Sequence, residues 1–261
     1  MYKLGYSLIL VVLANFSQAQ TEAKISGEEI LVRYFQAIGG KERWENLESR
    51  KAKENLSLFV SSGLMEMEDE VLDYTKYFQA PNSYLDLWFQ DMYYSTYVQT
   101  PGCVWYYLDK SISVLFPGKK YRKREATFPR IGVLEILNFP MVGSVFLEDD
   151  SYRVDFEDKF WKRVMSVYFD RESFLITKHS YTDLGGDYHE YLYKDYQKKD
   201  GYLEPYLIEN YVDSKKYKAI RVKSIDYNLD IDPTMFTPPT KCISKSESVT
   251  VPLKERMPFI F

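Results

Sequence analysis

The stretch SGEEILVRYFQAIGGKERWENLESRKAKE, residues 26–54, predicts an amphipathic helix near the start of the chain that must pack against a larger apolar surface. Ser26 and Glu29 form a capping box at the helix start, and Gly39 with Gly40 supplies the left-handed conformation that ends many helices. The apolar residues recur at helical spacing and form one stripe, which consists of Ile30, Leu31, Tyr34, Phe35 and Ile38. Because the rest of the chain is mostly strand-like, we expect a sheet to cover this stripe.

The segments that follow have the pattern of β-strands joined by short turns. Trp44 and Leu47 indicate a second short helical turn, and we expect the first long strand to start near Ser57. Hairpins are predicted between residues 165–169 and 174–177, around Gly185-Gly186, and between residues 206–212 and 217–225. Since neighbouring strands joined by tight turns are antiparallel, the sequence predicts an antiparallel meander.

Residues 131–139 form the only other helical pattern, in which Leu134 and Leu137 lie on one side and Pro140 ends the helix. We expect this short helix beside the N-terminal one, with both across the same face of a curved sheet. The fold class is therefore mainly β (α+β). No shift in composition marks a domain boundary, so we predict one domain over residues 20–240, with a tail or added edge strand over residues 241–261.

Residues 1–19 have the features of a secretory signal peptide. Lys3 precedes an apolar run over residues 8–13, which is far shorter than the roughly 20 residues that cross a bilayer as a helix. Ser17-Gln18-Ala19 is a small-x-small cleavage sequence, and no cysteine follows it to carry a lipid. We therefore expect a soluble, non-lipidated protein in the periplasm.

The composition is that of a folded protein rich in aromatic residues, which make up 17% of the chain and include 24 Tyr. The formal net charge of −4 argues against nucleic acid as the main partner. Cys103 and Cys242 could form a disulfide in an oxidising compartment, and two unpaired thiols are the alternative.

The sequence lacks the common motifs of catalysis. It has only two histidines, His179 and His189, with no GxSxG motif and no glycine-rich phosphate loop. We therefore predict no catalytic residue and no cofactor.

One cluster has the residue types that bind metal ions, namely His179, Asp183, Asp187 and His189. A two-residue turn at Gly185-Gly186 would pair His189 with Thr182 across the hairpin. It would also pair His179 with Leu192. Because side chains alternate along a strand, the two histidines would then point to opposite faces of the sheet, and we predict a polar hairpin without a metal.

Three charged runs have more than one interpretation. The acidic residues 66–70 and 148–150 could supply paired carboxylates for catalysis, and solvated turns are the simpler interpretation. A basic run could dock on anionic headgroups or an acidic protein, or could keep the edge of a strand soluble. This run consists of Lys119, Lys120, Arg122, Lys123 and Arg124.

Five stretches together resemble the periplasmic lipoprotein-carrier (LolA-like) and outer-membrane lipoprotein-sorting superfamily. They are YFQAIGGKERWENLES (34–49), KYFQAPNSYLDLWF (76–89), PGCVWYYLD (101–109), VYFDRESFLITK (167–178) and RVKSIDYNLDIDPTMFTPP (221–239). The arginine by which well-studied carriers hold their helices has no evident counterpart. The residues after 239 lie outside the common pattern.

The resemblance implies an antiparallel half-barrel whose concave side is covered by helices and holds acyl chains. It implies a non-catalytic periplasmic carrier or binder of lipoprotein acyl chains or another hydrophobic ligand. Such a protein would act as a monomer and exchange its ligand with membrane-associated donor and acceptor proteins. A partner-binding or sensing protein of the same fold is the alternative, and an enzyme with an unrecognised site is a third hypothesis.

The ligand cavity is expected among apolar residues on the concave side, and a dry packed core at the same positions is the alternative. The expected lining residues are Ile30, Tyr34, Phe35, Ile38, Leu85, Leu87, Phe89, Leu134, Leu137, Met165 and Val167.

The signal peptide gives a direct prediction about the mature protein. Expression with export should yield a chain that begins at Gln20 and carries no fatty acyl group, because cleavage follows the small residue Ala19. Intact mass and N-terminal sequencing of the exported protein check this. A different first residue, or an acyl group on the mature chain, would contradict it.

Overall fold

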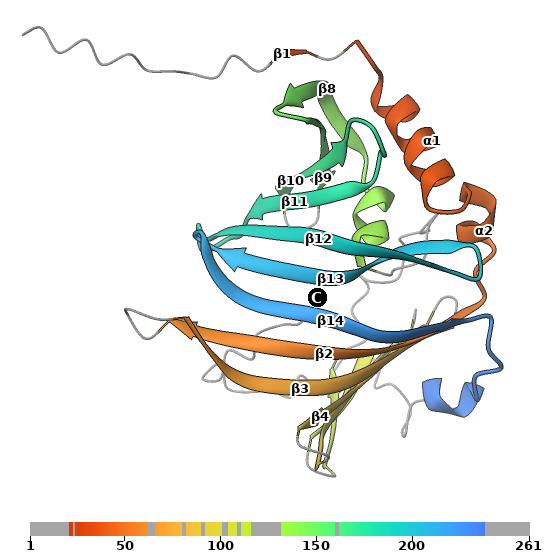
Figure 1. Ribbon diagram of the computed structural model, residues 1–261. Helices are drawn as coiled ribbons and strands as arrows, with labels where there is room; N and C mark the ends of the chain where they lie inside the picture. Colours follow the sequence, from red (N-terminus) through yellow and green to blue (C-terminus); the bar gives the residue numbers. More distant parts are fainter. Residues whose placement is uncertain are drawn as a thin grey trace, which may run out of the picture.

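One curved antiparallel sheet dominates the structure, which is a computed structural model (Figure 1). The structure describes residues 21–22, 24–61, 66–79, 82–89, 92–100, 104–108, 111–115, 132–159 and 162–237. Within this part of the chain the sheet has 14 strands and is not closed, because β1 and β7 form its two edges. The predicted half-barrel with a helical cover is confirmed.

The helices are α1 (Gly27–Ala37), α2 (Lys41–Glu45) and two 3-10 helices, η1 (Gly132–Asn138) and η2 (Pro233–Phe236). The first seven strands are β1 (Thr21–Glu22), β2 (Ser49–Ser61), β3 (Glu66–Gln79), β4 (Asn82–Phe89), β5 (Met92–Gln99), β6 (Val104–Leu108) and β7 (Ser111–Leu115). The other seven are β8 (Met141–Glu148), β9 (Ser151–Asp158), β10 (Arg163–Asp170), β11 (Ile176–Thr182), β12 (Tyr188–Lys199), β13 (Tyr202–Val212) and β14 (Lys215–Tyr227).

The strand order departs from a simple meander at one place. The order across the sheet is β1-β8-β9-β10-β11-β12-β13-β14-β2-β3-β4-β5-β6-β7. Two runs of sequential antiparallel strands, β2 to β7 and β8 to β14, are therefore joined by the pairing of β14 with β2. Turn residues in a sequence indicate hairpins. No turn joins β14 to β2, so the sequence does not indicate this pairing of distant strands.

The predicted hairpins at residues 165–177 and 206–225 are confirmed, as β10 with β11 and β13 with β14. The second of these turns at Asp213 and Ser214, whose φ angles of 48° and 66° are those of a type I′ turn. The acidic residues 66–70 lie in β3 and not in a turn, which corrects that interpretation. Asp149 and Asp150 do form an exposed turn between β8 and β9.

The start of β2 corrects the sequence analysis, which placed it near Ser57. The strand begins at Ser49, and its inward positions Arg50 and Glu54 are only 5% exposed. Charged residues at buried positions hide the apolar alternation that marks a strand. They can be buried here because each has a partner of opposite charge in the sheet.

The partner of Arg50 is Glu204 in β13, and the two side chains form a bidentate ion pair with both distances at 2.8 Å. The Tyr227 hydroxyl in β14, the strand between them, donates to Glu204 at 2.7 Å. The ring of Tyr227 stacks on Tyr202, which meets Trp44 of α2 edge to face. This network therefore connects β2, β13, β14 and α2 at one end of the sheet.

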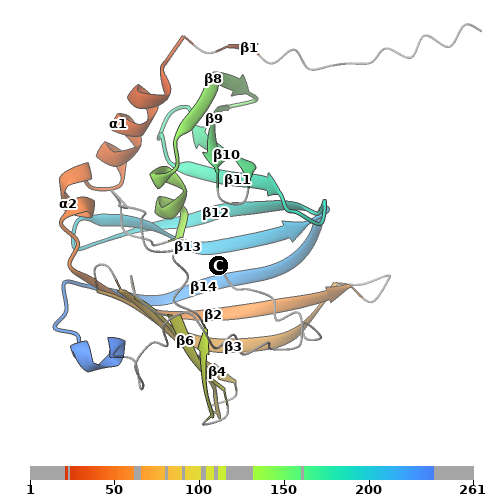
Figure 2. The same cartoon turned by 180° about the vertical axis from the view of Figure 1, so that it is seen from behind.

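Helix α1 begins as predicted, with the Ser26 side chain accepting a hydrogen bond from the Glu29 backbone N–H at 3.1 Å. It ends at Ala37, and the positive φ angles of Gly39 and Gly40 turn the chain into α2. The predicted second turn at Trp44 is confirmed as α2, and the helix predicted over 131–139 is the 3-10 helix η1. Figures 1 and 2 show α1 and η1 side by side next to the sheet. None of the described helices is long and apolar enough to cross a membrane.

The ion pair between Arg50 and Glu204 gives a test of how the sheet is held together. Replacing Glu204 by Gln should lower the free energy of unfolding by about 3–5 kcal/mol, since it leaves a buried guanidinium without its main counter-charge. Urea denaturation measures the change. The control is Asp73→Asn, which breaks the exposed pair with Lys223 and should cost about 1 kcal/mol or less. Equal losses in the two variants would contradict the role given to the buried pair.

Candidate functional site

The candidate site is the space between the sheet and the helical lid, by which we mean α1 and η1. The lid and strands β8 to β12 share one cluster of buried apolar side chains, called the apolar cluster below. Eight of the predicted lining residues belong to it, namely Ile30, Tyr34, Phe35, Ile38, Leu134, Leu137, Met165 and Val167. The other three, Leu85, Leu87 and Phe89, lie in β4 as expected, and their side chains are outside the described residues.

The middle of α1 contacts the sheet through side chains. The ring of Tyr34 lies 5.6 Å from that of Phe169 in an edge-to-face arrangement, and both residues are at most 2% exposed. The Arg33 guanidinium lies over the ring of Phe174, 4.8 Å from its centroid. These contacts make the lid part of a close-packed interior, so a ligand can enter only if the lid moves.

Backbone and arginine contacts fix the end of α1 to the turn between β12 and β13. The Leu203 N–H donates to the Ile38 carbonyl at 3.1 Å, and the Arg43 guanidinium donates to the Gly201 carbonyl at 2.7 Å. A Cβ atom on Gly39 would lie 2.0 Å from that same carbonyl oxygen, so only glycine permits this approach. Arg43 thus connects α2 to the turn between β12 and β13, a contact that the sequence alone did not identify.

Beyond the lid, the same face of the sheet carries a group of stacked rings. In β10 the residues that face the lid are Met165, Val167 and Phe169. Residues paired across neighbouring strands lie on the same face of a sheet. The partners of these three residues in β11 therefore face the lid as well. The stacked rings, called the aromatic ladder below, are those of His179, Tyr181, His189, Tyr191 and Tyr193. The ladder leads from the apolar cluster, which includes Tyr191 and Tyr193, to the half-buried rim at Tyr181 and His189.

The placement of the histidines corrects the sequence analysis. Thr182 pairs with Tyr188 and His179 with Tyr191, so both histidines lie on the same face. The turn contains five residues, because Asp183 accepts hydrogen bonds from the backbone N–H groups of Gly185 at 2.8 Å and Asp187 at 3.1 Å. The odd number of loop residues shifts the register by one residue and reverses the predicted facing.

The two histidines differ in their surroundings. His179 is buried, hydrogen-bonded through Nδ1 to the Tyr193 hydroxyl at 2.7 Å, and burial together with the charge of Arg163 lowers its pKa to about 3. It is therefore neutral near pH 7 and a poor general base. His189 Nε2 lies 3.3 Å from Asp183 at the rim. Among the described residues, no group of three or more His, Cys, Asp or Glu side chains could hold a metal ion.

Two cations stand beside the aromatic ladder without a carboxylate partner in the described structure. Lys218 in β14 is 4% exposed, and its ammonium lies 5.6 Å from the ring centroid of Tyr191. The guanidinium of Arg163 in β10 lies 4.3 Å from the ring centroid of Tyr181, and its buried Nε has no hydrogen-bond partner. After burial, which is the largest cause, both cations contribute to the lowered pKa of His179.

Two other inward-facing cations in the described part of the sheet are paired. Arg50 has Glu204, and Lys76 lies 3.3 Å from Glu54, whose pKa is lowered by Lys76 and Arg50 despite its burial. Burial of Lys218, with a smaller effect of Lys76, lowers the pKa of its ammonium to about 8. A buried cation that no carboxylate compensates lowers stability, so Lys218 is not explained by the packing of the sheet.

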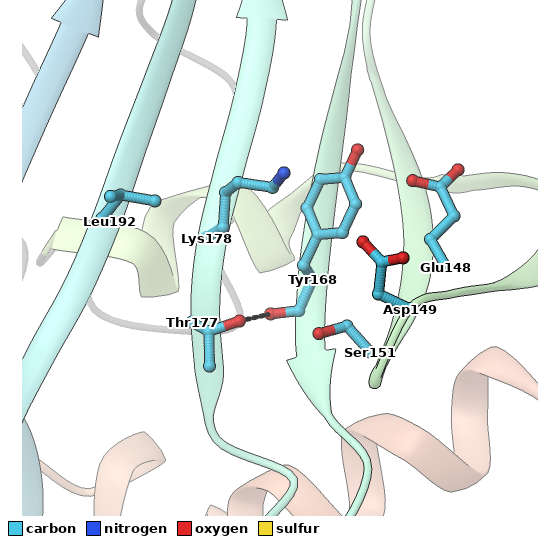
Figure 3. Close-up of a pocket in the computed structure, with 7 residues that line it drawn as sticks. All are labelled: Glu148, Asp149, Ser151, Tyr168, Thr177, Lys178 and Leu192. Atoms are coloured by element: carbon cyan, nitrogen blue, oxygen red, sulfur yellow. Dashed lines mark hydrogen bonds between the residues drawn. The ribbon is translucent and has the colours of Figure 1, made fainter.

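The opposite face of the sheet has a shallow pocket of about 220 Å³, lined mostly by polar and charged residues (Figure 3). Lys178 crosses it, 4.1 Å from the ring centroid of Tyr168 and 3.3 Å from Glu190. A second hollow of about 520 Å³ lies beside Ser49 and Asn228 and is also mainly polar. Neither has the apolar walls that an acyl chain requires.

Several predicted features lie outside the described residues, so their structure is not tested. They are the signal peptide (1–19), the tail (241–261), Cys103, Cys242, and the basic run of Lys119, Lys120, Arg122, Lys123 and Arg124.

The fold is similar to three solved structures. A LolA superfamily protein from Nitrosomonas europaea matches with a TM-score of 0.58 and 11% identity, covering 82% of this chain and 98% of that one. A DUF1329 family protein from Desulfovibrio piger matches with a TM-score of 0.54 and 11% identity, covering 79% and 96%. A domain assigned to outer membrane lipoprotein sorting, from Vibrio parahaemolyticus, matches with a TM-score of 0.51 and 12% identity, covering 80% and 95%.

No protein-family model and no curated protein matches the sequence. At such low identity the structural similarity concerns the fold alone. The LolA-like fold that the sequence resembles is therefore confirmed.

The cost of burying Lys218 can be measured. Lys218→Met should raise the free energy of unfolding at pH 7 by about 1–3 kcal/mol, because each unit by which burial depresses a lysine pKa corresponds to about 1.4 kcal/mol. The pKa of Lys218 is lowered from 10.5 to about 8, so the unfolded chain binds the proton more tightly. The wild-type penalty is therefore complete below pH 8 and fades as the pH rises towards 10.5.

Urea denaturation at pH 7 and at about pH 9.5 should accordingly show a smaller gain at the higher pH. Lys223→Met in the same strand is the control, because the Lys223 side chain is 53% exposed and its removal should change little. A Lys218→Met protein that is less stable than wild type at pH 7 would show that the ammonium supports the fold.

Proposed function

We propose that this protein, which has a LolA-like fold, is a non-catalytic carrier or binder of an acylated, hydrophobic ligand in the periplasm. The ligand would lie between the concave face of the sheet and the helical lid. The titles of two proteins of similar fold refer to the LolA superfamily and to lipoprotein sorting, which supports this choice of ligand class.

The observation that carries the proposal is the apolar cluster between lid and sheet. The inner side of α1 supplies Ile30, Tyr34 and Phe35, and η1 supplies Leu134 and Leu137. An acyl chain that enters here replaces one set of apolar contacts by another and gains about 0.8 kcal/mol for each CH₂ group that leaves water. Opening the lid therefore costs less when a chain of this kind fills the space.

The contacts at the end of α1 indicate how the lid could open. Between its two ends α1 contacts the sheet through side chains, whereas Ile38 and Arg43 are hydrogen-bonded to the turn between β12 and β13. In the proposed mechanism the lid separates from the sheet when these hydrogen bonds break. Arg43 then controls the rate of ligand uptake without being part of the ligand surface.

Freshly purified protein gives the first test. Native mass spectrometry should show protein with bound lipid, and the delipidated protein should bind a fluorescent fatty acid such as cis-parinaric acid. An empty, stable monomer that takes up no fatty acid would contradict the proposal and favour a partner-binding protein of the same fold.

Arg43→Ala should raise the rate of fatty-acid uptake about tenfold, because a hydrogen bond from a charged donor contributes about 1.5–3 kcal/mol. Stopped-flow fluorescence measures the rate. Glu42→Ala, an exposed position of the same helix, is the control and should leave the rate unchanged. If Arg43→Ala takes up fatty acid at the wild-type rate, Arg43 does not hold the lid closed.

A further inference from the structure

We propose that the patch formed by Lys218, Arg163 and the aromatic ladder binds the anionic head of the ligand, so that the ligand is a long-chain carboxylate or phosphate and not a neutral lipid. This inference rests on the proposed function and defines its ligand class more closely. The apolar cluster would take the tail, and the patch would take the head.

The register places the patch on the same face as the apolar cluster. His179 pairs with Tyr191, Tyr191 with Asn210, and Asn210 with Lys218, which forms one row of inward-facing residues across β11 to β14. The next row pairs Tyr181 with His189. A ligand that follows the ladder outward from Tyr193 therefore passes from apolar surroundings to the two cations.

The two cations of the patch, Lys218 and Arg163, lie beside aromatic rings. Neither has an ion pair or hydrogen bond to a described carboxylate, although the buried Asp158 is the cross-strand partner of Arg163. Asp183, at the rim end of the ladder, is already engaged with His189 and with the backbone of its own turn. A ligand anion beside Lys218 would therefore not compete with Asp183.

The chemistry of the two cations suits an oxyanion. The guanidinium of Arg163 offers N–H donors in a plane, and one of them, Nε, is buried without a partner. The Lys218 ammonium has three donors, and the residue is only 4% exposed. Carboxylate or phosphate oxygens would satisfy these groups, whereas the hydroxyl or ester group of a neutral lipid would leave the cations uncompensated.

The amphiphile is tested with a matched pair of probes, palmitate and 1-hexadecanol, added to the delipidated full chain in a competition assay with cis-parinaric acid. Wild type should bind palmitate at least tenfold more tightly than 1-hexadecanol. Lys218→Met should weaken palmitate binding by about 10- to 100-fold, as expected for loss of a charged hydrogen bond, and leave 1-hexadecanol binding unchanged. Lys223→Met, exposed on the same strand, should bind both probes as wild type does.

Arg163→Met gives a second, independent variant, and circular dichroism and urea denaturation verify that each variant is folded. Equal affinity of wild type for the two probes, or an equal loss of both in the folded Lys218→Met or Arg163→Met protein, would overturn the inference while the proposed carrier function stands. Competition by inorganic phosphate as strong as that by palmitate would show an anion site that does not recognise an amphiphile. Failure of wild type to bind either probe would refute the proposed function, and this inference with it.

Discussion

The pairing of β14 with β2 is the constraint on which the rest of the structure depends, because it joins two runs of strands into one sheet. Arg50 and Glu204 hold this junction from the inner side, where their bidentate contact spans β14. Burial of two charges costs free energy that only good geometry recovers, and the Tyr227 hydroxyl completes that geometry. The same network reaches α2 through Tyr202 and Trp44, so the sheet junction also positions the helix that follows the end of α1.

The inner face of the sheet consequently contains two kinds of charge. Near the junction, Arg50 and Lys76 are matched by Glu204 and Glu54, and these pairs belong to the architecture. Farther along the strands, Lys218 is buried beside Tyr191 without a carboxylate. Natural proteins keep such destabilising groups chiefly where function requires them. The stability that the protein loses through such a group is supplied by other parts of the fold. Both regions lie on the same face of the same sheet. The contrast between the paired cations and Lys218 therefore supports a functional role for Lys218 more strongly than its burial alone.

The sequence predicted the elements that local patterns determine. The N-cap at Ser26, the stop at Gly39 and the hairpin between β13 and β14 depend on residues within a few positions of one another, and all are confirmed. The pairing of β14 with β2 and the early start of β2 were missed, since both depend on contacts between residues far apart in the chain. The prediction that the two histidines lie on opposite faces was wrong, because the Asp183 carboxylate accepts backbone hydrogen bonds that lengthen the turn. Eight expected lining residues were found together, since apolar periodicity identifies a buried face. Periodicity does not say whether a face meets other side chains or a ligand, and it assigns no role to a lone lysine.

The position of Lys218 changes the energetics expected of a carrier. In a purely apolar groove the free energy of binding grows with the length of the tail, and any sufficiently long hydrophobic ligand competes. A buried cation adds a penalty that is present in the empty protein and is removed only by a ligand that brings an anion. A neutral lipid then binds through its tail alone, whereas an anionic lipid also removes the penalty of the buried cation. The protein therefore distinguishes the two kinds of lipid by this penalty, which only the anionic lipid removes. Because the lid must open before either part of the ligand enters, the same buried charge that destabilises the empty form would favour the filled one.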